Sequence, residues 1–307
     1  MFGKKSNGAI TATLLLAIFL WGANNAATKY IVKFWQPGWI GCSRLLCGGI
    51  VMMGILKWTR WMGTLSPLTP AMNRNLWLGG ALGLAVYIEV FNWALYFTSP
   101  SHVALYLGMS PVWTLLWDEP PSFSWSSAQR YAAAGLALTG VVVLFWPALH
   151  TGSSRWVGEL FGFSASILWA NFGRQCRALG AKLSGAEISA HTMWRAGVWL
   201  IPIALYEIAR HGLLLRADLI ALQTYCFIGG GILAYAFWNN ALRHWPTSRV
   251  FLFNNLIPLS TMAWAWVCLG EPVTRTFWLA TVCVMVGVIM GQARWPKIIT
   301  ANWPPEE

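Results

Sequence analysis

Charge is scarce in this sequence, and negative charge is scarcest. Only 10% of the 307 residues are charged, with 10 Asp and Glu against 21 Lys and Arg, whereas soluble domains carry about 25% charged residues. Long polar segments are also missing, so no separate soluble catalytic or regulatory domain is expected. Intrinsic disorder is excluded because 57% of the residues are hydrophobic and 15% are aromatic. The composition therefore predicts an integral membrane protein.

Short motifs for catalysis or metal binding are missing as well. The sequence has no G-x-S-x-G elbow, no H-E-x-x-H and no G-x-x-x-x-G-K-[ST] loop, and its six cysteines form no C-x-x-C pair. We therefore expect no enzyme activity, no cofactor and no metal. A net charge of +11 would suggest nucleic-acid binding in a soluble protein. In a membrane protein the same charge indicates cytoplasmic loops, so no nucleic-acid partner is expected.

Apolar runs separated by polar residues, proline or glycine are what the sequence does contain. A helix that crosses about 30 Å of hydrocarbon needs about 20 residues, and most of the runs come close to that length. The runs cover residues 10–32, 38–57, 76–97, 103–117, 129–146, 157–178, 187–209, 223–244, 247–268 and 274–292. They predict an all-α integral membrane fold with ten transmembrane helices.

Positive charge is unevenly distributed between the loops of this ten-span arrangement. Thirteen Lys and Arg residues fall on the side of the N-terminus and six on the opposite side. Cytoplasmic loops are enriched in Lys and Arg. Both termini are therefore predicted to be cytoplasmic, in a multi-pass protein of the plasma membrane, which is the inner membrane in bacteria.

The two halves of the chain match at a shift of 147 residues. This shift pairs Asn92 with Asn239, Ala94 with Ala241, Leu95 with Leu242, Pro111 with Pro258 and Trp117 with Trp264. A shift of 151 pairs Arg44 with Arg195. Because five spans is an odd number, a second five-span copy would enter the membrane from the opposite side. We therefore expect two inverted repeats, over 8–148 and 155–293, which are typical of carriers.

Two matched spans carry a proline, and a proline interrupts helical hydrogen bonding. Interrupted spans at matching places in two halves indicate a substrate site, although the prolines could also only kink the helices for packing. Four residues are predicted to have structural or gating roles: Arg44, Arg195, Pro111 and Pro258.

Glu89 is the acidic residue deepest inside a predicted span, where a carboxylate is costly unless it meets water, a cation or a polar partner. Asn92 and Tyr96 share its helical face. Glu89 could bind a substrate ammonium group or a proton, or it could form a structural hydrogen bond to Arg44 or Arg195. The predicted substrate-binding residues are Trp21, Asn24, Glu89, Asn92, Tyr106, Ser110, Trp113, Trp169, Tyr235, Trp238, Asn239 and Asn255.

Several short motifs follow one another along the chain: Trp21-Gly22-x-Asn24-x-x-x-x-Lys29, Arg44 after Pro37, Asn92-x-Ala94-Leu95 with Ser101, Pro111 and Glu119-Pro120, then Ala241-Leu242, Ser248, Pro258 and Leu269-Gly270-Glu271. Their order resembles that of the EamA-type carriers of the drug/metabolite transporter superfamily. The resemblance implies two inverted five-span repeats around a central cavity, and transport of small metabolites such as amino acids, nucleotide sugars or drugs.

These observations together predict a carrier that exports a small zwitterionic or cationic metabolite by alternating access, with an amino acid, aromatic in the first instance, as the expected substrate. Glu89 would bind the amine, asparagine amides the carboxylate, and aromatic faces the side chain. The alternatives are export of lipophilic cations or drugs, and a non-transporting membrane enzyme or receptor. The expected partners are the substrate and the lipid bilayer, with protons as a candidate coupling ion, and the protein is a monomer or a homodimer.

Overall fold

The computed structural model describes residues 7–59, 62–118, 125–150, 155–245, 250 and 252–292. Every regular element within these ranges is a helix. In the first half the elements are α1 (Asn7–Ile31), α2 (Pro37–Trp58), α3 (Pro70–Asn75), η1 (Leu76–Ala81), α4 (Leu82–Phe97), α5 (Pro100–Gly108), α6 (Ser110–Asp118) and α7 (Trp125–His150). In the second half they are α8 (Arg155–Leu179), α9 (Gly185–His211), α10 (Ala217–Tyr225), η2 (Cys226–Leu233), α11 (Ala234–His244), η3 (Leu252–Leu256), α13 (Ile257–Leu269) and α14 (Arg275–Gln292).

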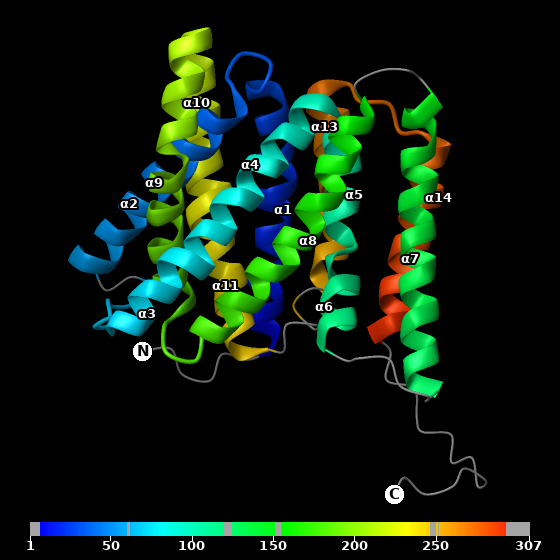
Figure 1. Ribbon diagram of the computed structural model, residues 1–307, viewed down its shortest axis with the longest axis horizontal. Helices are drawn as coiled ribbons and strands as arrows, with labels where there is room; N and C mark the ends of the chain where they lie inside the picture. Colours follow the sequence, from blue (N-terminus) through cyan, green and yellow to red (C-terminus); the bar gives the residue numbers. More distant parts are fainter. Residues whose placement is uncertain are drawn as a thin grey trace, which may run out of the picture.

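The helices run up and down one bundle, and the beginning of α1 and the end of α14 lie at the same end of the bundle (Figure 1). Some apolar runs form one helix, and others form helices joined end to end, such as α3–η1–α4 and α10–η2–α11. Four helical segments are long and apolar enough to cross a membrane by length and composition: Gly8–Ile31, Pro37–Trp58, Pro70–Phe97 and Ala217–His244.

Large apolar side chains, not charged ones, cover much of the outside of the bundle. Val267 of α13 is 69% exposed, and Leu205 of α9 and Leu279 of α14 are also exposed. A soluble monomer rarely exposes large contiguous apolar patches, whereas hydrocarbon solvates such side chains without cost. The outer surface therefore suits a lipid environment.

Two buried carboxylates cap helix ends inside this apolar bundle. Glu207 of α9 accepts hydrogen bonds from the backbone N–H groups of Gly38 (3.1 Å) and Trp39 (2.9 Å) in the first turn of α2. Glu187 forms a capping box with Ser184 at the start of α9. The first N–H groups of a helix lack partners and carry partial positive charge, so a carboxylate is stabilised there.

Glycines allow helices of the two halves to cross in backbone contact. A Cβ on Gly49 of α2 would lie 2.2 Å from the backbone nitrogen of Trp194 in α9. A Cβ on Gly197 of α9 would lie 2.7 Å from the backbone nitrogen of Leu46 in α2. The crossing is reciprocal, because a shift of 148 residues relates 46 to 194 and 49 to 197.

The helices α7 and α14 cross in the same reciprocal way. A Cβ on Gly140 would lie 2.8 Å from the carbonyl oxygen of Ala280, and one on Gly287 would lie 2.7 Å from that of Ala133. A shift of 147 residues relates 133 to 280 and 140 to 287. These reciprocal contacts relate α7, the last helix described in the first half, to α14, the last helix described in the second half.

A positively charged side chain near the end of α1 binds backbone carbonyls at the end of α4. In the other half, a positively charged side chain near the end of α8 binds carbonyls at the end of α11. Lys29 Nζ donates to the carbonyl oxygen of Leu95 at 2.7 Å, and Arg177 of α8 donates to that of Leu242 at 3.1 Å. Each cation also bonds a carbonyl three residues further on, those of Thr98 and Trp245 respectively. Positive groups are favourable at helix C-termini, where carbonyls lack partners.

Candidate substrate cavity and polar network

A small cavity of about 30 Å³ lies between helices of both halves. Its lining residues are Trp21, Asn24, Asn25, Arg44, Leu45, Tyr87, Ile88, Phe91, Leu107, Trp169, Gly230, Gly231, Tyr235 and Ile257. Pockets that hold small molecules usually measure about 300–1,000 Å³. In this conformation the cavity is therefore far too small for a metabolite, which can enter only if side chains or helices move apart.

Aromatic rings from four elements form one wall of the cavity. The ring of Trp169 in α8 lies with its centroid 5.5 Å from that of Trp21 in α1 and 5.1 Å from that of Tyr87 in α4. Tyr235 of α11 lies 5.5 Å from Trp21, in an edge-to-face arrangement. Such pairs stabilise the cluster beyond simple area burial, and their faces suit an aromatic group or a cation.

The glycine-rich segment of α10–η2–α11 lines part of the cavity, and its backbone is locally a π-helix. Gly230 and Gly231 line the cavity, and the Gly230 carbonyl accepts a hydrogen bond of 2.9 Å from the indole N–H of Trp21. A Cβ on Gly230 would lie 2.5 Å from Oδ1 of Asn24. π-helical turns are frequent at functional sites. The glycines here allow α1 and η2 to approach each other.

Arg44 supplies the only charge among the residues that line the cavity. Its guanidinium donates to Thr28 Oγ1 at 3.5 Å and to Asn92 Oδ1 at 3.4 Å, and it lies 6.0 Å from the centroid of the Phe91 ring. The Asn92 amide nitrogen donates to the carbonyl oxygen of Pro37 at 3.0 Å, which turns the amide oxygen toward Arg44. Arg44 was predicted as a structural or gating residue, and the structure places it in the cavity wall.

The two proline-bearing spans are both interrupted, and they meet at the interruptions. In the first half α5 ends at Gly108 and α6 begins at Ser110, and in the second half η3 passes into α13 with Pro258 in its first turn. A Cβ on Gly108 would lie 3.2 Å from the Pro258 ring. The Asn254 amide donates to the Leu107 carbonyl at 3.3 Å. The breaks therefore lie beside the cavity, which Leu107 also lines.

Four of the predicted substrate-binding residues line the cavity: Trp21, Asn24, Trp169 and Tyr235. Six others are buried or half-buried near it, outside the lining: Asn92, Tyr106, Ser110, Trp113, Trp238 and Asn239. The ring centroid of Trp238 lies 5.2 Å from that of Trp21, and the Trp113 indole N–H donates to Ser166 Oγ at 2.9 Å. Asn239 donates to Ser189 Oγ at 2.7 Å. The side chains of Pro111 and Asn255, and residues Glu119, Pro120 and Ser248, lie outside the described part of the chain.

Glu89 is not among the lining residues. Its Oε1 accepts a hydrogen bond of 2.8 Å from the indole N–H of Trp93, one turn further along α4. Its Oε2 is buried and has no hydrogen-bond partner among the described residues. The helical face that it was predicted to share is divided, because Asn92 is fully buried whereas Tyr96 is 42% exposed. An amine-binding role for Glu89 stays a prediction.

Arg195, which the repeat pairs with Arg44, is tied to its surroundings. Its guanidinium contacts His191 Nδ1 at 2.9 Å and donates to Asn73 Oδ1 at 2.9 Å. It also lies 4.4 Å from the Trp194 ring. These contacts distinguish Arg195 from Arg44, and its structural or gating role stays a prediction.

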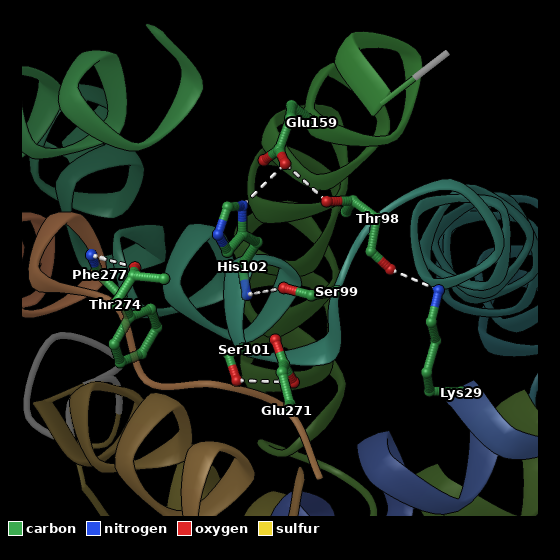
Figure 2. A network of polar contacts seen from close by, with 9 residues as sticks. All are labelled: Lys29, Thr98, Ser99, Ser101, His102, Glu159, Glu271, Thr274 and Phe277. Carbon is green, nitrogen blue, oxygen red and sulfur yellow. Dashed lines mark hydrogen bonds and ion pairs between the residues drawn. The ribbon is translucent and has the colours of Figure 1, made fainter. Parts of the chain in front are cut away.

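A second polar site lies at the end of the bundle where α4 passes into α5. Figure 2 shows fully buried Glu159 of α8 between His102 and Thr98, with Oε1 at 2.8 Å from His102 Nδ1 and accepting from Thr98 Oγ1 at 2.6 Å. Beside His102, Ser101 donates to Glu271 at 3.1 Å. A pocket of about 110 Å³ adjoins this network.

Sequence reasoning missed Glu159, Glu207 and Phe91. Glu159 and Glu207 fall near the ends of predicted spans, so neither was recognised as a buried carboxylate. The predicted span 157–178 already contained Glu159, but its partner His102 lies on another helix, α5, so the pair could not be predicted from the sequence. Phe91 is one apolar residue among many, and its position over Arg44 follows only from the packing of α4 against α2.

Membrane-length helices around a small central cavity, with interrupted helices at its edge, define a membrane transport protein. The sequence profile of the EamA-like transporter family matches residues 8–146 and again 156–291. The chain therefore belongs to the EamA-like transporter family. It is an integral membrane protein of a transporter family and not an enzyme, as predicted.

Individual relatives are distant but extend over most of the chain. "Uncharacterized transporter YyaM" of Bacillus subtilis (strain 168) is 24% identical, over 91% of this chain and 92% of that protein. "Probable amino-acid metabolite efflux pump" of Escherichia coli (strain K12) is 22% identical, over 93% and 96%. "Probable terminal-alkyne amino-acid exporter" of Streptantibioticus cattleyicolor is 22% identical, over 63% and 64%.

A solved structure described only as "Crystal structure of protein" has the same fold. It matches with a TM-score of 0.67 at 18% identity, and the match covers 94% of this chain and 98% of that one. At this identity the likeness concerns the arrangement of helices alone.

Proposed function

We propose that this protein exports small zwitterionic or cationic metabolites, with aromatic amino acids as the first candidates, by alternating access through the central cavity. The observation that carries the proposal is the composition of the cavity wall, where aromatic faces lie beside asparagine amides and one guanidinium. Apolar surroundings with a few directed polar groups are typical of small-molecule sites. The names of two distant relatives, an amino-acid metabolite efflux pump and an amino-acid exporter, favour the same substrate class.

We further propose that the architecture is ten spans in two inverted repeats, over 8–148 and 155–293. The reciprocal crossings of α2 with α9 and of α7 with α14 are the contacts that a pseudo-two-fold axis produces. Lys29 lies in the last turn of α1 and Arg177 in the last turn of α8. Helices α1 and α8 run in opposite directions in the bundle, as inversion requires (Figure 1). The two π-helical segments, η1 and η2, also occupy matching places.

Alternating access would then follow from the position of the cavity between the repeats. The cavity of the present conformation is too small for a metabolite, so we assign this conformation to a closed intermediate between two open forms. The breaks at Gly108 and Pro258 leave the helices free to bend on either side of the cavity. Each break belongs to a different repeat, so bending at one break could open the cavity to one side of the membrane and bending at the other break to the opposite side.

Protons are the coupling ion that we propose, and the buried Glu159–His102 pair supports this. The two groups lie 2.8 Å apart, beside a pocket of about 110 Å³. Two other charged groups belong to this network: Lys29, which donates to the Thr98 carbonyl, and Glu271, which accepts from the Ser101 hydroxyl. A change of charge on His102 or Glu159 would alter the contact that joins α8 to the start of α5.

The transport proposal is tested with the purified full chain in sealed vesicles. Vesicles preloaded with unlabelled tryptophan or phenylalanine are expected to accumulate the labelled amino acid by exchange, whereas vesicles without protein do not. An imposed pH gradient should drive net movement, and a protonophore should abolish it. Exchange of tetraphenylphosphonium without exchange of amino acids would favour the drug-export alternative. A lack of exchange for every compound would leave the transport proposal wrong.

Topology gives an independent prediction. Because thirteen Lys and Arg residues lie on one side and six on the other, both termini are expected in the cytoplasm. Fusions of a reporter that is active only in the cytoplasm, made at residue 307 and after residue 58, should be active. A fusion in the α9–α10 connection near residue 213 should be inactive. Activity at residue 213 together with inactivity at residue 307 would contradict the proposed orientation.

A further inference from the structure

We infer that the cavity recognises its substrate by a free carboxylate group, which the Arg44 guanidinium binds. The substrate class would then be aromatic carboxylates, zwitterionic or anionic, and amines without a carboxylate would be excluded. This inference rests on the proposed transport function. It differs from the sequence prediction, in which Glu89 bound the amine and asparagine amides bound the carboxylate.

The first argument is that the charge of Arg44 is buried without an anionic partner. Arg44 is only 4% exposed, and no carboxylate of the described residues forms an ion pair with it. Its two acceptors, Thr28 and Asn92, are neutral, and their distances of 3.5 and 3.4 Å are longer than good N–H···O hydrogen bonds. A guanidinium carries five N–H donors, so several of them remain for a ligand.

The second argument is that a buried cation is stable only when it is paired or well hydrogen-bonded. Among the described residues the cavity wall supplies amides and aromatic rings but no anion. A substrate carboxylate would supply the anion that this wall lacks. It could accept two parallel N–H bonds from the guanidinium, which is the strongest geometry for this pair.

The third argument comes from comparing Arg44 with Arg195 in the other half. Arg195 uses its donors on His191 and Asn73, at 2.9 Å in both cases, and does not line the cavity. Arg44 has longer bonds and does line it. The two halves therefore use their arginines differently: Arg195 is held by short contacts away from the cavity, whereas Arg44 has longer contacts and lies in the cavity wall.

The remaining groups of the wall suit the rest of an aromatic amino acid. Asn24 Oδ1 is buried and has no hydrogen-bond partner among the described residues, so it can accept from an ammonium group. Tyr87, Trp169 and Tyr235 offer faces for an aromatic side chain or for the ammonium group. A permanent lipophilic cation would gain the aromatic contacts but would meet repulsion from Arg44.

The experiment compares three ligands that share an indole ring, using the full chain in proteoliposomes. Tryptophan has both charged groups, indole-3-propionate has only the carboxylate, and tryptamine has only the ammonium group. We expect tryptophan and indole-3-propionate to inhibit exchange of labelled tryptophan, and tryptamine to be weaker by about tenfold or more. If tryptamine competes as well as tryptophan, the carboxylate inference is wrong while the transport proposal stands. If tryptophan is neither bound nor exchanged, the transport proposal fails first.

Substitutions test whether Arg44 or Glu89 is the charged group that recognises the substrate. Arg44→Gln should weaken tryptophan binding by about tenfold to hundredfold and remove the discrimination against tryptamine. Arg44→Lys should keep that discrimination, and Arg210→Gln, which removes an exposed positive charge at the end of α9, controls for net charge. If Glu89→Gln lowers tryptophan affinity while Arg44→Gln does not, Glu89 is the charged group that recognises the substrate and this inference is overturned. Thermal stability of each variant shows whether it is folded.

Discussion

Gly49→Leu is expected to prevent recovery of folded protein, because leucine cannot fit where α2 crosses α9. The added Cβ alone would lie 2.2 Å from the backbone nitrogen of Trp194, and backbone atoms cannot move aside as a flexible side chain can. Overpacking of a tight core by a few methylenes typically costs about 1–3 kcal/mol, and here the helices themselves must separate. Size-exclusion profiles and thermal unfolding of the detergent-extracted protein measure the effect.

Gly135→Leu is the matched control for this substitution. Gly135 lies on the outside of α7, and a Cβ placed there meets no atom within 4 Å among the described residues. This variant should elute and unfold like the unmodified protein. If Gly49→Leu behaves in the same way as Gly135→Leu, the backbone contact between α2 and α9 is not required for folding.

Trp169→Ala is expected to abolish exchange of aromatic amino acids. The Trp169 ring packs against Trp21, Tyr87 and Tyr235 in the cavity wall, with centroid distances of 5.5, 5.1 and 6.0 Å. Its removal takes away one of the two indole rings that line the cavity and leaves a hole. Loss of a buried tryptophan costs about 3–5 kcal/mol, so thermal stability should fall as well.

Two further variants distinguish the site from the fold in this experiment. Trp169→Phe keeps an aromatic ring and should retain most of the exchange activity. Trp266→Ala removes a tryptophan of α13 that is 64% exposed on the outside of the bundle, and it should leave exchange unchanged. Normal exchange by folded Trp169→Ala would contradict the placement of the substrate in the aromatic cavity.

Helix positions follow closely from the sequence because an apolar run in hydrocarbon has few alternatives to a helix. The run predicted at 38–57 is α2 over Pro37–Trp58, and the run at 157–178 is α8 over Arg155–Leu179. The interruption near Pro111 was also predictable, since proline removes a helical hydrogen bond. The π-helical turns were not, because their wider backbone depends on how η1 and η2 pack against neighbouring helices.

The sequence predicted the kinds of residue that form the candidate site better than it predicted which individual residues face the cavity. Trp21, Asn24, Trp169 and Tyr235 were selected as polar or aromatic residues at span depth, and they line the cavity. Glu89 was selected by the same argument, yet it accepts from Trp93 outside the lining. Depth along a helix is a property of sequence, whereas the direction in which a residue faces depends on the rotation of that helix within the bundle.

The sequence by itself determined that the chain lies in a membrane, forms helices over its apolar runs and belongs to a transporter family. These properties depend on local composition and on the order of short motifs, so one chain is sufficient to reveal them. Tertiary structure decided which of two matched arginines lines the cavity. Arg44 and Arg195 carry the same charge on the second helix of their halves, but Asn73 and His191 happen to meet only Arg195. That difference arises from contacts between residues far apart in the chain, which no pattern along the sequence contains.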